Sequence, residues 1–177
     1  MLRDFEEPDW KLVHEYSSDP EVVRFMPWGP NTVEDTQNFI RRSIANQQEQ
    51  PRKNYSLAAL LTSQNVLIGS CGIYVSNPDL REGYIGYVFN RNYWGKGYAT
   101  ETSKALLRFG FEQLKLHRIY AYCNPSNIAS ARVLEKSGMN LEGHFREHRW
   151  FKGKWVDTLQ YAILDHEWKR TTPDNET

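Results

Sequence analysis

Residues 83–124 read "GYIGYVFNRNYWGKGYATETSKALLRFGFEQLKLHRIYAYCN", and they predict a strand, a helix and a second strand. "GYIGYVFN" and "HRIYAYCN" have the pattern of strands, whereas the residues from Ala99 onward follow the 3.6-residue period of a helix. The helical positions are Ser103, Leu106, Leu107, Gly110 and Leu114. A strand, a crossover helix and a further strand normally form a parallel pair, so we expect Val88 and Ala121 in neighbouring strands of one sheet.

The sequence on both sides of this unit alternates between helical and strand patterns. A short strand is expected at Leu2 to Phe5, and Thr32 with Asp35 resembles a capping box at the start of a helix. The other expected elements are helices in 8–18, 31–50 and 127–138, an antiparallel hairpin from 55–62 and 65–75, and a closing hairpin in 139–168 around "KGK" at 152–154. We therefore expect an α/β (α+β) fold, with a single domain over residues 1–170 and a frayed tail at 171–177.

The composition favours a neutral, cytoplasmic protein. Lys plus Arg equals Asp plus Glu at 22 each, which argues against nucleic acid or an acidic membrane surface as a partner. No apolar stretch approaches the length of a membrane span, and the start, "MLRDFEEPDW", carries acids where a signal peptide would carry basic and apolar residues. Cys71 and Cys123 lie in apolar runs without CxxC spacing, so we expect buried reduced thiols.

Two glycines, Gly95 and Gly97, lie where the central strand leads into its helix. The first N–H groups of a helix have no intrahelical acceptor, and bare backbone there can bind a phosphate. The alternative is a tight loop that needs positive φ. A Walker loop is excluded because position 90 is Asn and position 97 is Gly, and a dinucleotide fingerprint is excluded because no acid occurs in 113–124.

Two motifs resemble the GNAT superfamily of N-acetyltransferases, and within it the branch of the ribosomal-protein N-terminal (alanine/serine) acetyltransferases. The first is "YVFNRNYWGKGYATETSKALLRFGF", residues 87–111, whose "WGKGYA" matches the family loop Gln/Arg-x-x-Gly-x-Gly/Ala with Trp94 in place of the polar residue. The second is "HRIYAYCNPSNIASARVLEKSGMNLEGHFRE", residues 117–147, where the family's Asn-x-x-Ser/Ala pattern and its later Gly and apolar residue map to Asn127, Ser130, Gly138 and Met139.

The resemblance implies a GNAT fold, with a mixed, strongly twisted sheet whose central parallel strands splay apart. Acetyl-CoA would place its pyrophosphate on the backbone amides from Gly95 to Thr100 and its pantetheine arm beside the strand that ends "YVFN". The implied cofactor-binding residues are Val88, Phe89, Asn90, Trp94, Gly95, Lys96, Gly97, Tyr98, Ala99, Thr100, Asn127 and Ser130. Gly86 suggests a bulge that would aim N–H groups at the thioester carbonyl, unless it only permits close packing.

Direct attack on the thioester requires a neutral amine, a base that takes its proton and an acid for the departing thiolate. Many GNAT enzymes place a tyrosine seven residues after the motif Asn, but this position is Leu134 here. The resemblance therefore assigns the acid role to Ser130, whose alternative role is local helix capping. Glu82 and Glu147 are the candidate bases, with Asp157 also in the closing hairpin that holds Glu147, although each is individually expected to be a surface or structural carboxylate.

Two aromatic residues are candidates for the substrate pocket. Trp28, in the Pro/Gly loop "FMPWGP", could form its floor or plug the space between helices, and Tyr87 lies in the central strand. No metal is expected, because His144 and His148 lie too far apart on a strand for shared ligation and lack a third ligand.

The sequence thus predicts transfer of acetyl from acetyl-CoA to a primary amine, with a protein N-terminus preferred as acceptor. The alternatives are the same chemistry on a small amine such as a polyamine or an antibiotic, or a non-catalytic sensor that binds acyl-CoA. A homo-oligomer is also an expectation.

Overall fold

The computed structural model describes residues 1–171, with side chains through Trp168, and these residues share one seven-stranded sheet. The strand order is β1-β2-β3-β4-β5-β7-β6, and every neighbouring pair is antiparallel except β4 with β5. The strands are β1 (Leu2–Asp4), β2 (Asn54–Leu61), β3 (Val66–Asn77), β4 (Glu82–Phe89), β5 (Arg118–Cys123), β6 (Asn140–Phe151) and β7 (Lys154–Leu164). This mixed sheet is the predicted architecture, and the parallel pair is the predicted one.

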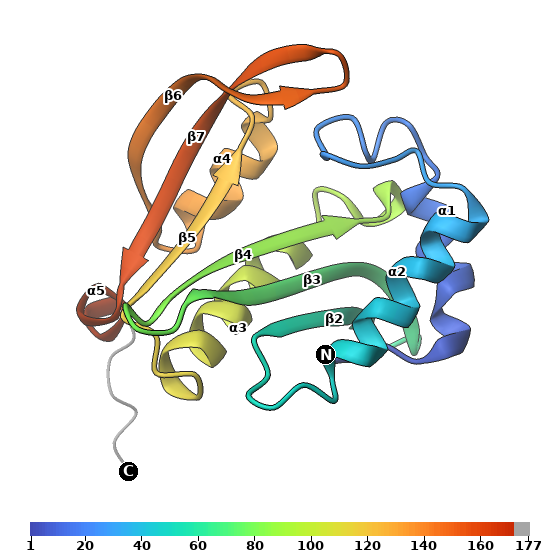
Figure 1. The fold of residues 1–177 in the computed structure, drawn as a ribbon, viewed down its shortest axis with the longest axis horizontal. Coiled ribbons are helices and arrows are strands. Elements are labelled where there is room, and N and C mark those ends of the chain that lie inside the picture. Colours follow the sequence, from blue (N-terminus) through green and yellow to red (C-terminus); the bar gives the residue numbers. More distant parts are fainter. Residues whose placement is uncertain (172–177) are drawn as a thin grey trace.

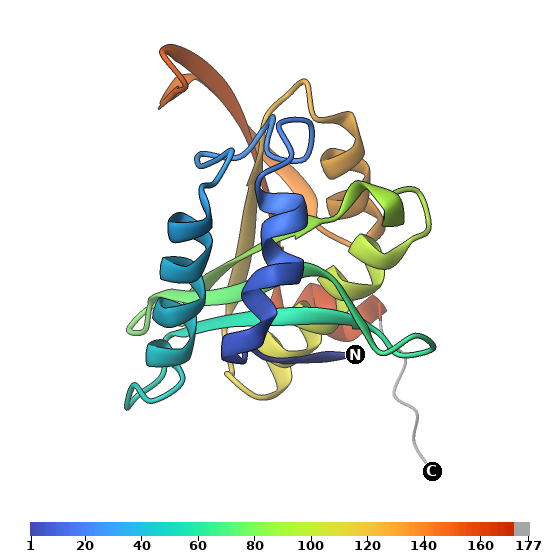
Figure 2. The same ribbon diagram turned by 90° about the vertical axis from the view of Figure 1, so that its right-hand side faces the viewer.

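Helices cover both faces of the sheet (Figures 1 and 2). α1 and α2 pack on one face around Val13, Tyr16 and Ile40, whereas α3 and α4 pack on the other around Leu106 and Leu134. The helices are the 3-10 turn η1 (Glu7–Asp9), α1 (Trp10–Ser17), α2 (Val33–Asn46), the 3-10 turn η2 (Arg91–Tyr93), α3 (Tyr98–Glu112), α4 (Ile128–Lys136) and α5 (Asp165–Thr171). Burying an apolar stripe of each helix against the sheet supplies most of the driving force for this arrangement.

The ends of two helices follow the predicted local signals. Thr32 caps α2 by accepting a hydrogen bond from the Asp35 N–H, and the Asp35 carboxylate accepts one from the Thr32 N–H. Gly138 follows the end of α4 with φ +90°, a conformation that favours glycine. Both predictions are confirmed.

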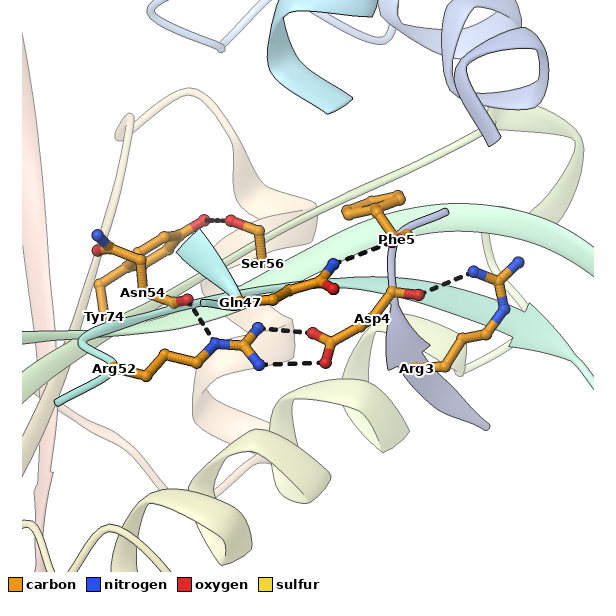
Figure 3. Close-up of polar contacts among 8 residues, drawn as sticks. All are labelled: Arg3, Asp4, Phe5, Gln47, Arg52, Asn54, Ser56 and Tyr74. Atoms are coloured by element: carbon orange, nitrogen blue, oxygen red, sulfur yellow. Dashed lines mark hydrogen bonds and ion pairs between the residues drawn. The ribbon is translucent and has the colours of Figure 1, made fainter. Parts of the chain in front are cut away.

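The N-terminal strand is fastened to the loop between α2 and β2 (Figure 3). The Arg52 guanidinium donates to both carboxylate oxygens of Asp4, at 2.6 and 3.1 Å, and to the Asn54 carbonyl at 3.0 Å. Gln47 Nε2 donates to the Phe5 carbonyl at 2.9 Å. These contacts fix the far edge of the sheet, away from the parallel pair.

The parallel strands β4 and β5 are paired at one end only. Their register runs from Glu82–Arg118 to Tyr84–Tyr120 and stops there. Beyond it, β4 continues on β3 as far as Phe89 and β5 continues on β7 as far as Cys123, so the two strands diverge (Figure 1). We call residues 82–84 and 118–120 the closed end, and residues 85–89 and 121–123 the open end.

Two details differ from the sequence predictions. The expected bulge at Gly86 is absent, because β4 pairs with β3 in unbroken register from Tyr84 to Phe89, with Gly86 opposite Gly72. The closing hairpin ends at Leu164 rather than continuing to residue 168, because residues 165–171 form α5. The Glu167 carboxylate accepts the Leu164 N–H at 2.8 Å, which satisfies backbone at the start of this helix. Of the predicted tail, Thr171 ends α5, and 172–177 lie outside the described residues.

The hairpin of β6 and β7 is also less regular than predicted. Its register shifts between Leu141 and Gly143 and again between Phe145 and Arg149. Glu147, inside the second irregularity, has φ +49°, and its N–H donates to Asp157 at 2.9 Å. This bulged strand curls toward the loop between α1 and α2 (Figure 1).

Candidate active site

The glycine loop between β4 and α3 needs glycine for its backbone conformation. Gly95 has φ +73° and Gly97 has φ +85°, and Gly97 is the N-cap of α3. A Cβ built on either glycine would meet no other atom within 4 Å. The glycines therefore do not serve close packing within the protein, and the space beside them is open for a ligand.

The loop is held by its own polar contacts. Trp94 Nε1 donates to the Phe89 carbonyl at 2.8 Å, and Lys96 Nζ donates to the Asn92 carbonyl at 3.1 Å. Asn90 accepts the Asn92 N–H at 3.1 Å. Trp94, which departs from the family pattern, thus ties the loop to the end of β4 while its side chain stays 48% exposed.

The N-terminus of α3 opens toward the same loop. The N–H of Glu101 donates to the Gly97 carbonyl at 3.0 Å, so the predicted phosphate-binding amides of Tyr98, Ala99 and Thr100 precede the regular helical bonds. The helix dipole places about half a positive charge at this end. The combination of bare loop and helix terminus suits an anion.

A second helix terminus, that of α4, lies across the open end. Asn127 is its N-cap, and the side-chain carbonyl accepts the Ser130 N–H at 3.2 Å. Capping uses the oxygen of this amide and leaves the NH₂ group for other partners. Asn127 can therefore cap the helix and donate to a ligand at the same time.

Tyr87 and Ser130 meet at the open end, although they are 43 residues apart in sequence. The Tyr87 hydroxyl lies 3.0 Å from Ser130 Oγ and donates to the Ser130 carbonyl at 3.3 Å. Burial raises the pKa of Tyr87, and its hydrogen bond to Ser130 opposes this rise. The tyrosine hydroxyl is therefore neutral at physiological pH and carries a proton that it can donate.

Leu134, at the position where many GNAT enzymes carry a tyrosine, points into the core. Its side chain is 1% exposed and packs in the cluster formed with Leu106, Ile119 and Ile163. A hydroxyl on α4 at this position would be buried among apolar groups. The tyrosine hydroxyl near Ser130 comes instead from β4.

The two cysteines are buried free thiols, as predicted. Burial raises the pKa of Cys71 to about 12 and that of Cys123 to about 11. Because the thiolate is the nucleophilic form, neither side chain is suited to carry an acetyl group in a covalent intermediate.

The two candidate bases, Glu82 and Glu147, lie in different strands. Glu82 is at the closed end, where its carboxylate lies 3.4 Å from Arg118 Nε. Tyr87 follows Glu82 by five positions along an extended strand, which separates their Cα atoms by about 16 Å. Glu82 is therefore too distant to take a proton directly from an amine near Ser130.

Glu147 lies on the bulged strand β6 with an exposed side chain. Asp157 next to it accepts the Glu147 N–H and a hydrogen bond from His144 Nε2 at 2.7 Å, and these two bonds lower the pKa of Asp157. The bulge is thus held by a carboxylate that stays ionised. His148 on the same bulge contacts Tyr122 instead, with ring centroids 5.8 Å apart.

Trp28 lies in the loop between α1 and α2 and is 37% exposed. Next to it Gly29 has φ +74°, and a Cβ there would lie 3.2 Å from the Ser17 carbonyl, so the loop folds tightly against the end of α1. Lys152, at the tip of the β6–β7 hairpin, donates to the Val23 carbonyl of this loop at 3.0 Å. The loop and the hairpin therefore meet, as Figure 1 shows.

The described residues also lack a metal-ligand cluster and a helix of membrane-spanning length. Residues 1–171 contain no group of three or more His, Cys, Asp or Glu side chains arranged to hold a metal ion. None of the helices in this part of the chain is long and apolar enough to cross a membrane.

Comparisons with known proteins agree with this geometry. Residues 1–140 match the model of the acetyltransferase (GNAT) domain family. The chain is 39% identical over 168 residues to the uncharacterized N-acetyltransferase YnaD of Bacillus subtilis (strain 168), covering 95% of each chain. It is 40% identical to the crystal structure of a GNAT-family acetyltransferase from Bacillus anthracis, with a TM-score of 0.83 and coverage of 93% of this chain and 94% of the other.

Two further similarities concern proteins with a named acceptor. A candidate ribosomal N-acetyltransferase of Bacillus subtilis (strain 168), YdaF, is 32% identical over 103 residues, which are 58% of this chain and 56% of YdaF. A spermidine N-acetyltransferase from Vibrio cholerae, solved with CoA and spermine, has a TM-score of 0.82 at 21% identity, over 95% of this chain and 96% of the other. The second similarity shows a shared fold.

Proposed function

Because this chain belongs to the GNAT family of N-acetyltransferases, which use acetyl-CoA, we propose that the open end binds acetyl-CoA and presents its acetyl group to the N-terminal amine of a protein. The observation that carries this proposal is the end of β4–β5 pairing at Tyr84 and Tyr120, beyond which β4 runs on alone toward the loop of Gly95 and Gly97. The pyrophosphate binds the amides of residues 95–100. The pantetheine arm runs along Val88, Phe89 and Asn90, where the strand edge faces the gap.

Transfer proceeds by direct attack of a neutral amine on the thioester. The new C–N bond forms and the C–S bond breaks; a carboxylate base takes the proton lost by the amine, and the released thiolate of CoA takes up a proton from water. The raised pKa values of Cys71 and Cys123 support this route over an acetyl-cysteine intermediate. Ser130 donates a hydrogen bond to the departing thiolate, and Asn127 donates its NH₂ group to the pantetheine arm.

Glu147 remains our proposed base, because Glu82 is paired with Arg118 at the closed end. Its side chain is exposed on the hairpin that meets the loop of Trp28. We propose that the acceptor enters between these two segments, with Trp28 and Tyr87 beside it. Conversion of Glu147 to Gln should lower kcat and shift its pH profile, whereas Glu82→Gln should do neither.

The preference for a protein N-terminus rests on two similarities. In the sequence motif, Ser130 takes the acid role that a tyrosine has in many GNAT enzymes, and the chain is similar to YdaF. The charges in the loop between α1 and α2, which holds Trp28, also fit this preference. Asp19 is paired with Arg91 at 3.2 Å, and Glu21 lies 3.6 Å from Arg24. A polycation such as spermidine needs carboxylates that are not already paired in this way. Acetylation of a small amine is the second candidate, favoured by the fold shared with the spermidine enzyme.

An assay of CoA thiol release with a panel of amines tests the proposal. The panel contains peptides beginning with Ala or Ser, the same peptides with a blocked α-amine and an internal lysine, spermidine and an aminoglycoside. We expect thiol release matched by acetylation of the free α-amine in mass spectra. Thiol release with spermidine alone would show that the acceptor is a polyamine and not a protein N-terminus. No release with any amine despite CoA binding would indicate an acyl-CoA sensor.

A cytoplasmic location and a homo-oligomer also stay proposals. Acetyl-CoA and newly made protein N-termini are both cytoplasmic, which supports the location. The hairpin carries the exposed apolar side chains Leu141, Phe145, Trp150 and Trp155, and β6 is the edge of the sheet. Light scattering of the full chain and of a Leu141→Lys, Trp150→Lys variant would test whether a second copy covers this surface.

A further inference from the structure

We infer that Tyr87 is a positioning residue that makes Ser130 a hydrogen-bond donor toward the thiolate of CoA. The inference rests on the proposed function and extends it to a residue of β4. Its starting point is the contact of the Tyr87 hydroxyl with both oxygens of Ser130, Oγ at 3.0 Å and the backbone carbonyl at 3.3 Å.

The number of protons on the pair limits which hydrogen bonds it can form, and either hydroxyl can donate to the other. Tyr87 is neutral, since burial raises its pKa, and therefore it has one proton to donate. The Cys123 thiol also contributes to the raised pKa of Tyr87, and it is neutral because burial raises its own pKa to about 11. Neither Tyr87 nor Cys123 therefore carries a charge that would draw the tyrosine proton away from Ser130.

The pair has two hydrogen-bond arrangements that need no movement of heavy atoms. In the first, Tyr87 donates to the Ser130 carbonyl, and Ser130 Oγ donates to the Tyr87 hydroxyl. In the second, Tyr87 donates to Ser130 Oγ, and the Ser130 proton points away from Tyr87. The Ser130 carbonyl lies in α4, where the helix already supplies an N–H donor, so it loses little in the second arrangement.

The second arrangement is the one that a thiolate selects. A thiolate is a stronger acceptor than a phenolic oxygen, and a hydroxyl that accepts one hydrogen bond becomes a better donor of its own proton. No proton has to leave Ser130 or Tyr87 in this step. A serine alkoxide or a buried tyrosinate would be far more basic than a thiolate, so hydrogen bonding alone stabilises the sulfur.

The arrangement also accounts for the missing tyrosine on α4. Leu134 occupies that position and is buried in the core, so a phenol there could not reach the thioester without repacking. Tyr87 supplies a phenol from the opposite side of the gap. It acts through Ser130 rather than on the sulfur itself.

A double-mutant cycle tests the inference. Tyr87→Phe keeps the ring and its packing but removes the hydroxyl, and it should lower kcat about tenfold with little change in the KM for acetyl-CoA. In the Ser130→Ala background the same change should have no further effect, because Tyr87 acts only through Ser130. Ser130→Thr, which keeps a hydroxyl, should retain sensitivity to Tyr87→Phe.

Tyr161→Phe is the matched control. The Tyr161 hydroxyl also comes from a strand and also donates to α4, but at Glu135, with a distance of 3.1 Å. Its removal should leave kcat unchanged. An equal loss of kcat from Tyr87→Phe with and without Ser130, or no loss at all, would overturn the inference.

A second measurement does not depend on turnover. The thiol of bound CoA is titrated by the ultraviolet absorbance of its thiolate in the wild-type complex and in the variants. Donation from Ser130 should give a lower pKa for bound CoA in the wild type than in either Ser130→Ala or Tyr87→Phe. An unchanged pKa in Tyr87→Phe overturns the inference, even if the proposed acceptor proves wrong or no amine is acetylated.

Discussion

The closed end and the open end of the β4–β5 pair lie in the same two strands and differ in what satisfies their polar groups. At the closed end, Glu82 faces Arg118, the backbones are paired, and the rings of Tyr84 and Tyr120 lie 5.6 Å apart. At the open end the strands have lost each other as partners. There the Tyr87 side chain of β4 reaches Ser130 of α4.

The difference separates stability from function. Where strand edges are paired, a substitution removes contacts that hold the fold, and no ligand is needed to complete them. Where strand edges diverge next to a helix terminus, the unpaired backbone can bind a peptide-like arm and an anion. We therefore expect changes at the open end to alter binding and turnover, and changes at the closed end to alter only stability.

The largest effect is expected for Gly97→Val. The side chain would strain a backbone with φ +85° and project into the open space of the loop. Loss of two or more hydrogen bonds to a charged phosphate, each worth about 1.5–3 kcal/mol, should weaken CoA binding by at least about a hundredfold in calorimetry.

Gly153→Val is the matched control, because Gly153 has φ +84° and equally open surroundings but lies at the hairpin tip. It should lower the melting temperature similarly and leave CoA affinity unchanged. Equal CoA affinity in the Gly97→Val protein would refute the assignment of the loop.

Ser130→Ala should have the next largest effect. Removing a hydrogen bond to the thiolate should lower kcat by about tenfold to a hundredfold, with little change in the KM for acetyl-CoA. Steady-state kinetics with a peptide acceptor measures both constants. A normal kcat would show that turnover at the open end needs no hydroxyl on α4. Only CoA binding would then distinguish the open end from the closed end.

A smaller effect is expected for Asn127→Asp. The carboxylate still accepts the Ser130 N–H as a cap, but the NH₂ donor is lost. The Kd of acetyl-CoA should rise about tenfold, the equivalent of one hydrogen bond, without a lower melting temperature. If calorimetry finds normal affinity, Asn127 is only a helix cap.

The smallest effect is expected at the closed end. Glu82→Gln breaks a partly exposed ion pair with Arg118, which should cost less than about 1 kcal/mol in urea unfolding and nothing in kcat. Arg118 would still be paired with Glu142. A clear loss of kcat in Glu82→Gln would contradict the separation of the two ends and return Glu82 to the candidate bases.

Local signals in the sequence predict most of the elements, because they depend on neighbouring residues. The cap at Thr32, the turn at 152–154 and the strand, helix and strand unit are of this kind. α5 was missed because "YAILDHEW" continues a strand-like pattern, although Asp165 and Glu167 in its first turn are a helix-start signal.

The contacts of the open end depend on distant residues and could not be predicted in this way. The pairing of Tyr87 with Ser130 joins β4 to α4, and the burial of Leu134 depends on packing against α3 and β7. At Gly86 a local signal was misleading, because a glycine in a strand suggested a bulge where the register is regular. One irregularity that the sequence did not signal is in β6, where Glu147 has positive φ although it is not a glycine.

Hydrogen–deuterium exchange of the full chain with and without CoA tests the distinction between the two ends most directly. We expect CoA to slow exchange in the amides of residues 86–90, 95–100 and 127–130, and to leave residues 82–84 and 118–120 unchanged. Equal protection at both ends, or protection elsewhere with none in the glycine loop, would contradict the account.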